Sequence, residues 1–347
     1  MKGAVWRGAY DVRLEELPQP ELSGPRDAVV RMTRSAICGT DLHPYRGEIA
    51  DFMVGTVLGH EFTGLVEEAG SEAGVRSGER VLASDLIACG RCRYCARGWH
   101  YHCPEASLFG YGTVVGDYVA GGQAEYVRVP NADLVLSAIP ASLGDEDALF
   151  AGDILTTAHT GAVEAGVLPG DSVVVVGCGP VGLLALMCVR LMGAETTIAL
   201  DPDPGRRAAA EGLGALALAP GPDAIAEIRD LCGGGADAVL EAVGSEAALL
   251  LALEGVRPRG TVVAVGSHTY ETMRFPVREA FARELTLRFA VGDPIRSRDE
   301  VLDLVAAGRL DPTVLISHRM SLADAPRAYE MFDRRQALKV VLTPIAP

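Results

Sequence analysis

A glycine-rich turn limits the possible folds of this chain more than any other sequence feature. It reads Gly177-Cys178-Gly179-Pro180-Val181-Gly182, and it stands between four valines at 173–176 and an apolar stretch that ends at Met192. In such a turn the first glycine permits a tight bend, the second lets the backbone approach a pyrophosphate, and the third lets helix and strand pack closely. The phosphate then lies at the helix N-terminus, where backbone N–H groups point outward. Strand, turn and helix together predict the first βαβ unit of a dinucleotide-binding sheet.

The sequence on both sides of this turn alternates between strands and helices. Beyond the predicted helix at 181–192, further strands are predicted at 196–200, 236–241 and 260–265. Strands that alternate with helices form a parallel sheet of right-handed βαβ units. We therefore expect an α/β fold whose second domain, residues 151–287, is a doubly wound, Rossmann-type parallel sheet.

Residues 1–150 have a different composition. They are rich in Gly, Pro and short β-branched runs such as 28–32, a pattern that predicts an irregular, mostly antiparallel β domain. A helix near 298–307 and a last strand at 339–343 are predicted after the α/β domain. We expect residues 288–347 to complete the first domain.

Asp201 bears on the identity of the dinucleotide. It ends the predicted strand 196–200, nearly twenty residues beyond the last glycine of the turn, where a carboxylate can accept hydrogen bonds from the adenosine ribose. A carboxylate there would repel a 2′-phosphate, so the sequence favours NAD over NADP. Arg206 and Arg207 are a counter-signal, because an arginine at this place could pair with that phosphate.

The charge balance excludes some classes of partner. The 347 residues carry a formal net charge of −15. Nucleic acids and anionic membranes both attract clustered Lys and Arg, so we expect neither as a partner. The N-terminal residues lack the apolar stretch of a secretion signal, and the longest apolar run, 173–189, is short for a membrane span and broken by Gly and Pro. We expect a cytoplasmic protein.

Half of the eight cysteines lie close together, at Cys89, Cys92, Cys95 and Cys103. In a cytoplasmic protein this spacing favours metal ligation over disulfides. Four thiolates suit a closed tetrahedral Zn²⁺ site that stabilises a loop. A zinc ribbon that binds nucleic acid is the alternative, and a single cluster inside a long acidic α/β chain disfavours it.

Two short sequence motifs in the first domain suggest a second metal site. They are Cys38-Gly39-Thr40-Asp41-Leu42-His43 and Gly59-His60-Glu61. Taken alone, Cys38 could be a small buried thiol and His60 a structural histidine. Together with a dinucleotide fold, they become candidate ligands of a reactive metal.

The chain resembles the zinc-containing alcohol dehydrogenases of the medium-chain dehydrogenase/reductase superfamily. The resemblance lies in these two motifs, the cysteine cluster, the glycine turn and Gly-Gly-Gln-Ala-Glu-Tyr at 121–126. The resemblance runs nearly end to end and implies a β-rich, GroES-like catalytic domain beside the Rossmann domain. It implies that Cys38 and His60 bind a catalytic zinc and that Asp153 is the third ligand. Many members have cysteine where Asp153 stands. The alternative for Asp153 is a helix cap. Glu61 is expected to ligate during exchange of water or substrate, or else to orient the site from outside it.

The resemblance also implies a mechanism. Zinc would acidify the alcohol, and the nicotinamide would accept its hydride. Thr40 would take up the proton, the nicotinamide ribose would relay it, and His43 would pass it to solvent; an ordinary loop histidine is the alternative for His43. Thr157 and Arg206 match positions that contact the cofactor in members of that family. The expected activity is NAD-linked interconversion of a secondary or small primary alcohol with its ketone or aldehyde, in a homodimer or homotetramer with two zinc ions per chain.

Other functions compete with this hypothesis. The same fold could act in formaldehyde oxidation or dismutation, or on a polyol or threonine-type substrate. A zinc-free reductase of the quinone oxidoreductase kind is disfavoured by the joint presence of Cys38, His60 and Asp153. A non-enzymatic protein that binds zinc and NAD would leave the proton-relay residues without a purpose.

Overall fold

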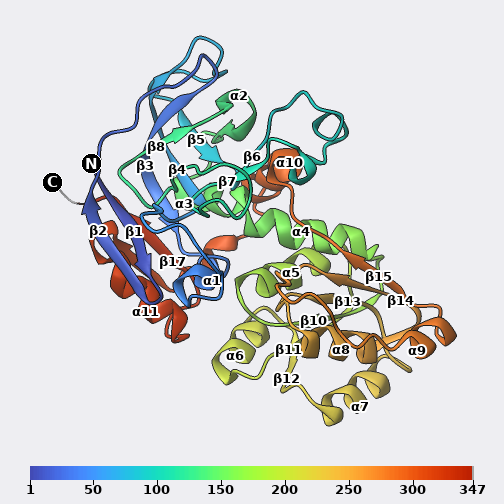
Figure 1. The fold of residues 1–347 in the computed structure, drawn as a ribbon. Coiled ribbons are helices and arrows are strands. Elements are labelled where there is room, and N and C mark those ends of the chain that lie inside the picture. Colours follow the sequence, from blue (N-terminus) through green and yellow to red (C-terminus); the bar gives the residue numbers. More distant parts are fainter. Residues whose placement is uncertain (346–347) are drawn as a thin grey trace. The chain divides into compact units, whose positions relative to one another are not determined.

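A computed structural model describes residues 1–345 and divides the chain into two compact units. The first unit comprises residues 1–153 and 293–347, and the second comprises residues 154–292. Figure 1 shows the elements of both units in the colours of the sequence. No helix within residues 1–345 has both the length and the apolar character needed to cross a membrane.

The second unit is built on one parallel six-stranded sheet, in the order β12-β11-β10-β13-β14-β15. Helices cover both of its faces, with α4 and α5 on one side and α7 and α8 on the other (Figure 1). The bounds are β10 Ser172–Val176, β11 Thr196–Leu200, β12 Leu216–Leu218, β13 Ala236–Glu241, β14 Val256–Ala264, β15 Thr286–Phe289, α4 Ile154–Ala165, α5 Pro180–Leu191, α6 Pro204–Gly212, α7 Pro222–Leu231, α8 Glu246–Gly255 and α9 Val277–Ala282. This architecture confirms the expected Rossmann-type sheet.

The glycine turn has the geometry that its sequence predicts. Gly177 has φ +94°, in the left-handed region that favours glycine. A Cβ on Gly182 would lie 1.8 Å from the carbonyl oxygen of Gly177, so no side chain fits there. Pro180 occupies the first turn of α5, where its missing N–H costs no helical hydrogen bond. The strand therefore passes into the helix with the N–H groups of the first helical turn facing outward.

The first unit is built on a seven-stranded sheet, in the order β16-β17-β3-β4-β5-β9, with β8 also paired to β3. All of its pairs are antiparallel except β16 with β17, as expected for a mostly antiparallel domain. The bounds are β1 Lys2–Gly8, β2 Asp11–Glu16, β3 Ala28–Ala36, β4 Glu61–Ala69, β5 Arg80–Ala83, β6 Leu86–Ile87, β7 Ser107–Leu108, β8 Tyr126–Val129, β9 Leu136–Ala138, β16 His318–Ser321, β17 Val340–Thr343, α1 Leu42–Tyr45, α2 Ala132–Val135, α3 Asp145–Leu149, α10 Pro294–Ala306 and α11 Ala325–Asp333.

Strand register in this sheet brings distant residues to one place. Ala36 at the end of β3 is paired with Glu61 at the start of β4, so the chain that continues to Cys38 lies beside the chain that arrives through His60. Strand β17 pairs with β3 on its other side, with Val341 opposite Ala36. The residue that precedes β17, Lys339, is thereby brought to the same edge.

Helix α10 is fastened to this sheet by one buried arginine. Arg298 has a side chain 8% exposed, and burial lowers the pKa of its guanidinium. It donates to the hydroxyl of Ser84 and to three consecutive backbone carbonyls, those of Leu134, Val135 and Leu136, at 2.7 to 3.1 Å. The helix begins at Pro294 rather than at the predicted Arg298, because Asp293 caps it by accepting from the N–H of Arg296.

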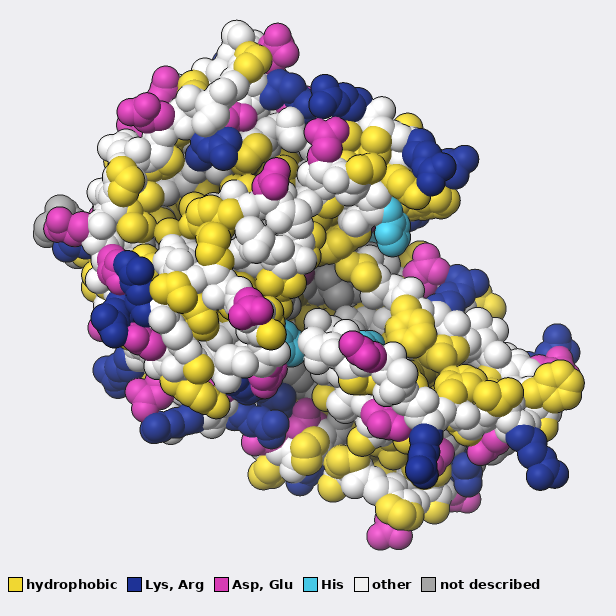
Figure 2. All heavy atoms as spheres, in the orientation of Figure 1, with side chains coloured by type: hydrophobic (Ala, Val, Ile, Leu, Met, Phe, Trp, Pro, Cys, Tyr) yellow, Lys and Arg dark blue, Asp and Glu magenta, His cyan; other side chains and the backbone are white. Residues whose placement is uncertain are grey.

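Apolar side chains remain exposed at one edge of the parallel sheet. Phe281 and Val277 on α9 are 84% and 67% exposed, and Phe289 and Val291, at and just beyond the end of β15, are 64% and 60% exposed. Figure 2 shows hydrophobic side chains gathered over this end of the second unit. We call these four residues the edge patch.

Candidate metal centres and cofactor turn

The structure brings Cys38, His60, Glu61 and Asp153 into one buried cluster. One ligand atom from each lies within 4.8 Å of the others. Oδ2 of Asp153 is 3.5 Å from Sγ of Cys38 and 3.3 Å from Nε2 of His60. Cys38 is 6% exposed, and His60 and Glu61 are each 1% exposed. Residues from three separate parts of the chain therefore converge on a single point, which we call the reactive cluster.

Asp41 holds two members of the reactive cluster in place. Its Oδ2 accepts a hydrogen bond of 2.9 Å from the backbone N–H of Cys38, and its Oδ1 lies 3.2 Å from Nδ1 of His60. Because Nδ1 faces Asp41, the other ring nitrogen of His60 faces the cluster, as in metal sites whose histidines are oriented by a carboxylate. Asp41 belongs to the sequence motif Cys38–His43, but the sequence alone did not indicate this role.

Lys339 is a second neighbour that sequence analysis missed. Its ammonium group, on a side chain 1% exposed, bonds Oε2 of Glu61. Oε1 of Glu61 is buried and has no hydrogen-bond partner within residues 1–345. Burial raises the pKa of Glu61 to about 7, against the opposing effect of Lys339. A lysine directly before the apolar strand β17 was the available signal, since a buried lysine needs a buried carboxylate.

These residues fit a divalent metal ion. The donor set of one sulfur, one imidazole nitrogen and carboxylate oxygens is typical of Zn²⁺. Burial and the carboxylates of Asp153 and Glu61 raise the pKa of Cys38 to about 11. Burial opposes protonation of His60, but Asp41 and Asp153 outweigh it and raise the pKa of the imidazole. A cation bound in the cluster would balance the negative charge of the surrounding carboxylates. It would also give the unpartnered Oε1 of Glu61 a partner.

Of the two predicted relay residues, Thr40 lies beside the reactive cluster, and both are less buried than Cys38 and His60. Thr40 Oγ1 is 3.9 Å from Sγ of Cys38. His43, on α1, has a side chain 19% exposed, and its Nδ1 lies 2.7 Å from a carboxylate oxygen of Glu48. Glu48 is a further neighbour that the sequence motif did not identify.

The four cysteines at 89–103 form a second cluster, which we call the cysteine lobe. Their Sγ atoms all lie within 4.8 Å of one another, with Cys92 and Cys95 at 3.5 Å and Cys89 and Cys95 at 4.0 Å. Four sulfurs about 2.3 Å from a tetrahedral zinc would stand about 3.8 Å apart. Backbone N–H groups of Cys89 and Glu105 point at Sγ of Cys103, as expected around thiolates. The geometry suits a closed zinc site.

Asp201 and Arg206, two of the predicted cofactor residues, lie beside the glycine turn in the second unit. Asp201 is 2% exposed, and both of its oxygens accept a backbone N–H, one from Cys178 and one from Asp203, each at 2.8 Å. The carboxylate therefore also shapes the glycine turn. An NH of Arg206 lies 3.9 Å from Asp201 and 3.8 Å from the place of a Cβ on Gly179, so this cation stands over the turn.

Thr157, the remaining predicted cofactor residue, lies on α4. It packs closely on Gly292, where an added Cβ would come within 2.2 Å of its Oγ1.

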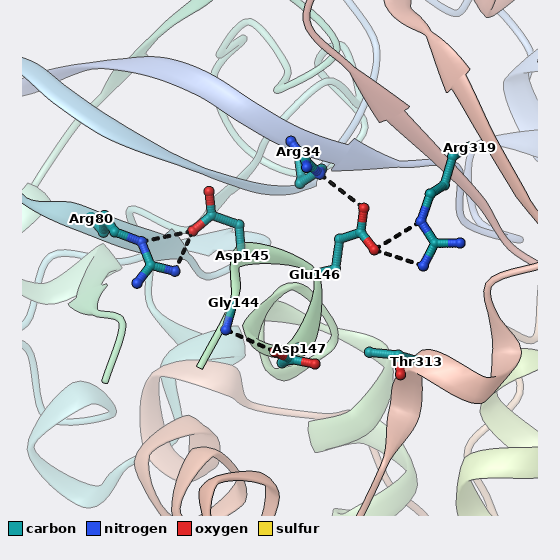
Figure 3. A pocket seen from close by; sticks show the side chains of 8 residues that line it. All are labelled: Arg34, Arg80, Gly144, Asp145, Glu146, Asp147, Thr313 and Arg319. Atoms are coloured by element: carbon teal, nitrogen blue, oxygen red, sulfur yellow. Dashed lines mark hydrogen bonds and ion pairs between the residues drawn. The ribbon is translucent and has the colours of Figure 1, made fainter. Parts of the chain in front are cut away.

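A separate cavity of about 500 Å³ lies in the first unit and contains no member of the reactive cluster. Figure 3 shows its charged lining. Arg34 and Arg319 both donate to Glu146, at 3.0 and 2.9 Å, and Arg80 donates to Asp145 at 2.6 Å. Each arginine is paired with a carboxylate of α3, so this network ties α3 to strands β3, β5 and β16.

Glu146→Gln is expected to lower the free energy of unfolding by about 1 kcal/mol near pH 7, because two arginines lose a charged acceptor. Partial burial opposes ionisation, but Arg319 and Arg34 outweigh it and lower the pKa of Glu146. A lowered folded-state pKa stabilises the protein above the ordinary carboxyl pKa of about 4.3, and this contribution is lost as the pH falls. The difference in Tm between variant and wild type should therefore shrink on acidification, whereas Glu21→Gln, at an exposed site, should change Tm little at either pH. An equal deficit at both pH values would contradict the network's role.

Comparison with known proteins agrees with this geometry. Residues 24–141 match the alcohol dehydrogenase GroES-like domain, and residues 180–307 match the zinc-binding dehydrogenase family. The alcohol dehydrogenase TADH from Thermus sp. ATN1 is 41% identical, with a TM-score of 0.95 over 99% of this chain and 100% of that one.

Two further relatives match along nearly the whole chain. An uncharacterized zinc-type alcohol dehydrogenase-like protein of Bacillus subtilis, AdhB, is 32% identical over 99% of this chain and 100% of its own length. A zinc-binding dehydrogenase from Sinorhizobium meliloti 1021, solved with NADP, is 30% identical, with a TM-score of 0.86 over 99% of each chain. The chain therefore belongs to the zinc-containing alcohol dehydrogenases of the medium-chain dehydrogenase/reductase superfamily, and is a zinc-dependent oxidoreductase that acts on CH–OH groups.

Proposed function

We propose that this enzyme oxidises a secondary or small primary alcohol to the ketone or aldehyde with NAD, at a zinc ion held by Cys38, His60 and Asp153. The observation that carries the proposal is the convergence of these side chains, within 4.8 Å of one another, from three distant parts of the chain. A ligand set of three protein groups leaves a fourth tetrahedral position for substrate. The cysteine lobe would hold a second zinc with no such position.

The protein side chains divide the work between binding and proton transfer. When bound, zinc lowers the pKa of an alcohol hydroxyl and the nicotinamide accepts a hydride. Thr40, beside Cys38, would accept the hydroxyl proton as it releases its own, and His43 would pass a proton to solvent. Glu48 keeps the imidazole of His43 oriented through its contact of 2.7 Å.

Glu61 serves as a reserve ligand. Lys339 holds one oxygen of its carboxylate, while the other is buried without a hydrogen-bond partner within residues 1–345. A carboxylate oxygen of Glu61 belongs to the group of ligand atoms that lie within 4.8 Å of one another. Glu61 would thus be available as a further ligand to a zinc ion held in the reactive cluster.

Asp201→Asn is expected to reduce the preference for NAD over NADP by at least about tenfold, which corresponds to about 1.4 kcal/mol. The change removes the negative charge that repels a 2′-phosphate and weakens the acceptor for the ribose hydroxyls. Arg206, 3.9 Å from Asp201, then remains as an unopposed cation for that phosphate. The measurement is kcat/KM with each cofactor. An unchanged ratio would show that Asp201 only shapes the turn through its contacts with Cys178 and Asp203.

We further propose that the edge patch is a contact between copies of the chain, in a homodimer or a homotetramer. Strand β15 is the last of its sheet and has one edge without a partner within residues 1–345. Exposed strand edges flanked by apolar side chains favour association. Phe281→Asp should shift the mass in solution toward the monomer by light scattering, whereas Val314→Asp, an exposed position outside the patch, should not. An unchanged mass in both variants would contradict this contact.

The proposed activity is tested by zinc analysis of the purified protein together with cofactor reduction on a substrate panel. Two zinc ions per chain and turnover of simple secondary or primary alcohols would support it. Turnover confined to polyols or threonine, or dismutation of formaldehyde with cofactor retained on the enzyme, would assign the competing reactions. NAD binding without turnover of any alcohol would contradict an enzymatic role.

A further inference from the structure

Asp85 is a buried carboxylate that the proposed chemistry does not use. It lies between β5 and β6 and is 3% exposed. Its Oδ2 accepts a hydrogen bond of 2.5 Å from the hydroxyl of Tyr101, and its Oδ1 is buried with no hydrogen-bond partner in the described part of the chain. Burial and the nearby charge of Asp153 raise the pKa of Asp85 well above its usual range. Asp85 is therefore within the electrostatic reach of the reactive cluster.

On one side, Asp85 contacts the peptide that precedes Asp153. Its backbone N–H donates to the carbonyl of Gly152 at 3.0 Å. A Cβ on Gly152 would lie 2.4 Å from the carbonyl oxygen of Ala83, so the two backbones touch without room for a side chain. Residues 83–85 thus form the surface on which the backbone of Asp153 rests.

On the other side, Asp85 is bonded to the cysteine lobe. Tyr101 lies in a short 3-10 helix, His100–His102, immediately before Cys103. Its ring packs on the buried cluster formed by residues of the lobe, among them Cys89, Cys95 and Cys103. The chain also runs from Asp85 through the short strand β6 to Cys89. The orientation of the Tyr101 hydroxyl therefore depends on the folded lobe.

We propose that Tyr101 is a positioning residue that couples the cysteine lobe to the reactive cluster. Its hydrogen bond to Asp85 keeps residues 83–85 against Gly152 and so keeps the carboxylate of Asp153 aimed at the metal. The lobe then does more than stabilise its own loop, because it positions a ligand of the second metal. This inference rests on the proposed metal-binding role of Asp153.

The test is Tyr101→Phe in the full-length enzyme, with zinc affinity measured at each site by competition with a chelator. Loss of a hydrogen bond that orients a ligand typically weakens metal binding by about 10- to 100-fold. We expect that loss of affinity at the reactive cluster and an unchanged zinc affinity in the lobe. Co²⁺ placed in the reactive cluster should show altered visible absorption bands.

Three further variants make the result specific. Tyr94→Phe removes a hydroxyl of the same lobe that accepts a hydrogen bond from the exposed side chain of Arg93, and it should leave both affinities unchanged. Asp85→Asn keeps an acceptor oxygen for Tyr101 and should stay close to the wild-type affinity, whereas Asp85→Ala should match Tyr101→Phe. Unchanged affinity at the reactive cluster in Tyr101→Phe, or equal weakening at both sites, would overturn the proposal. A wild type that binds both metals yet oxidises no alcohol would refute the proposed function alone.

Discussion

Asp153→Asn is expected to lower kcat/KM by about 10³-fold, or about 4 kcal/mol, and to remove one of two zinc ions per chain. The carboxamide carries no charge, so together with Cys38 it cannot balance the charge of a divalent cation. Cys38 and His60 would then be the two ligands left of the proposed three. In the structure Oδ2 of Asp153 is the atom that lies close to both of them, at 3.5 and 3.3 Å. The cysteine lobe shares no ligand with this site and should keep its metal.

Zinc content and steady-state kinetics, measured on the same preparation, check this result. Asp117→Asn makes the same chemical change at an exposed position of the same unit and should leave both quantities unaltered. Loss of both metals in Asp153→Asn would mean that the variant unfolds the unit. Retention of both metals with full activity would return Asp153 to the role of a helix cap.

Cys95→Ser is expected to have the second largest effect, on stability. Cys95 lies within 4.0 Å of the sulfurs of both Cys89 and Cys92, so its loss opens the tetrahedral site. Structural zinc contributes directly to the free energy of folding. A loss of about 3–5 kcal/mol corresponds to a fall in Tm of about 10 °C for a unit of this size. Calorimetry and zinc analysis measure the two consequences together.

Cys232→Ser is the matched control, because Cys232 is a partly buried cysteine in the second unit, outside both clusters. It should keep two zinc ions and change Tm by no more than about 2 °C. Equal falls in Tm for the two variants would show that the lobe is held by packing rather than by metal.

Local sequence signals located four of the six strands of the parallel sheet; β12 and β15 were not predicted, and β14 begins at residue 256 rather than at the predicted 260. Strands β10, β11 and β13 have the bounds that valine-rich and alternating segments between turn residues predict. The glycine turn was recognisable because three glycines at fixed spacing each meet a different steric requirement of the turn. The start of α10 was placed too late, since its signal is the Asp293 cap followed by Pro294 rather than an apolar period.

The surroundings of the reactive cluster could not be predicted, because they depend on strand register across the whole chain. Lys339 reaches Glu61 only because β17 pairs with β3 beside β4. Asp85 reaches Tyr101 through the fold of the lobe. The hydrogen bonds that Asp201 accepts from two backbone N–H groups likewise depend on the tertiary fold. Family resemblance named the ligand candidates, while the residues that hold them became apparent only from the fold.

Anomalous diffraction at the zinc edge, on crystals of the purified enzyme, tests the central claim most directly. We expect two peaks per chain, one among the sulfurs of the cysteine lobe and one about 2.0–2.3 Å from Sγ of Cys38, Nε2 of His60 and the carboxylate of Asp153. A single peak in the lobe, with the side chains of Cys38, His60 and Asp153 turned away from one another in the fully zinc-loaded protein, would contradict it.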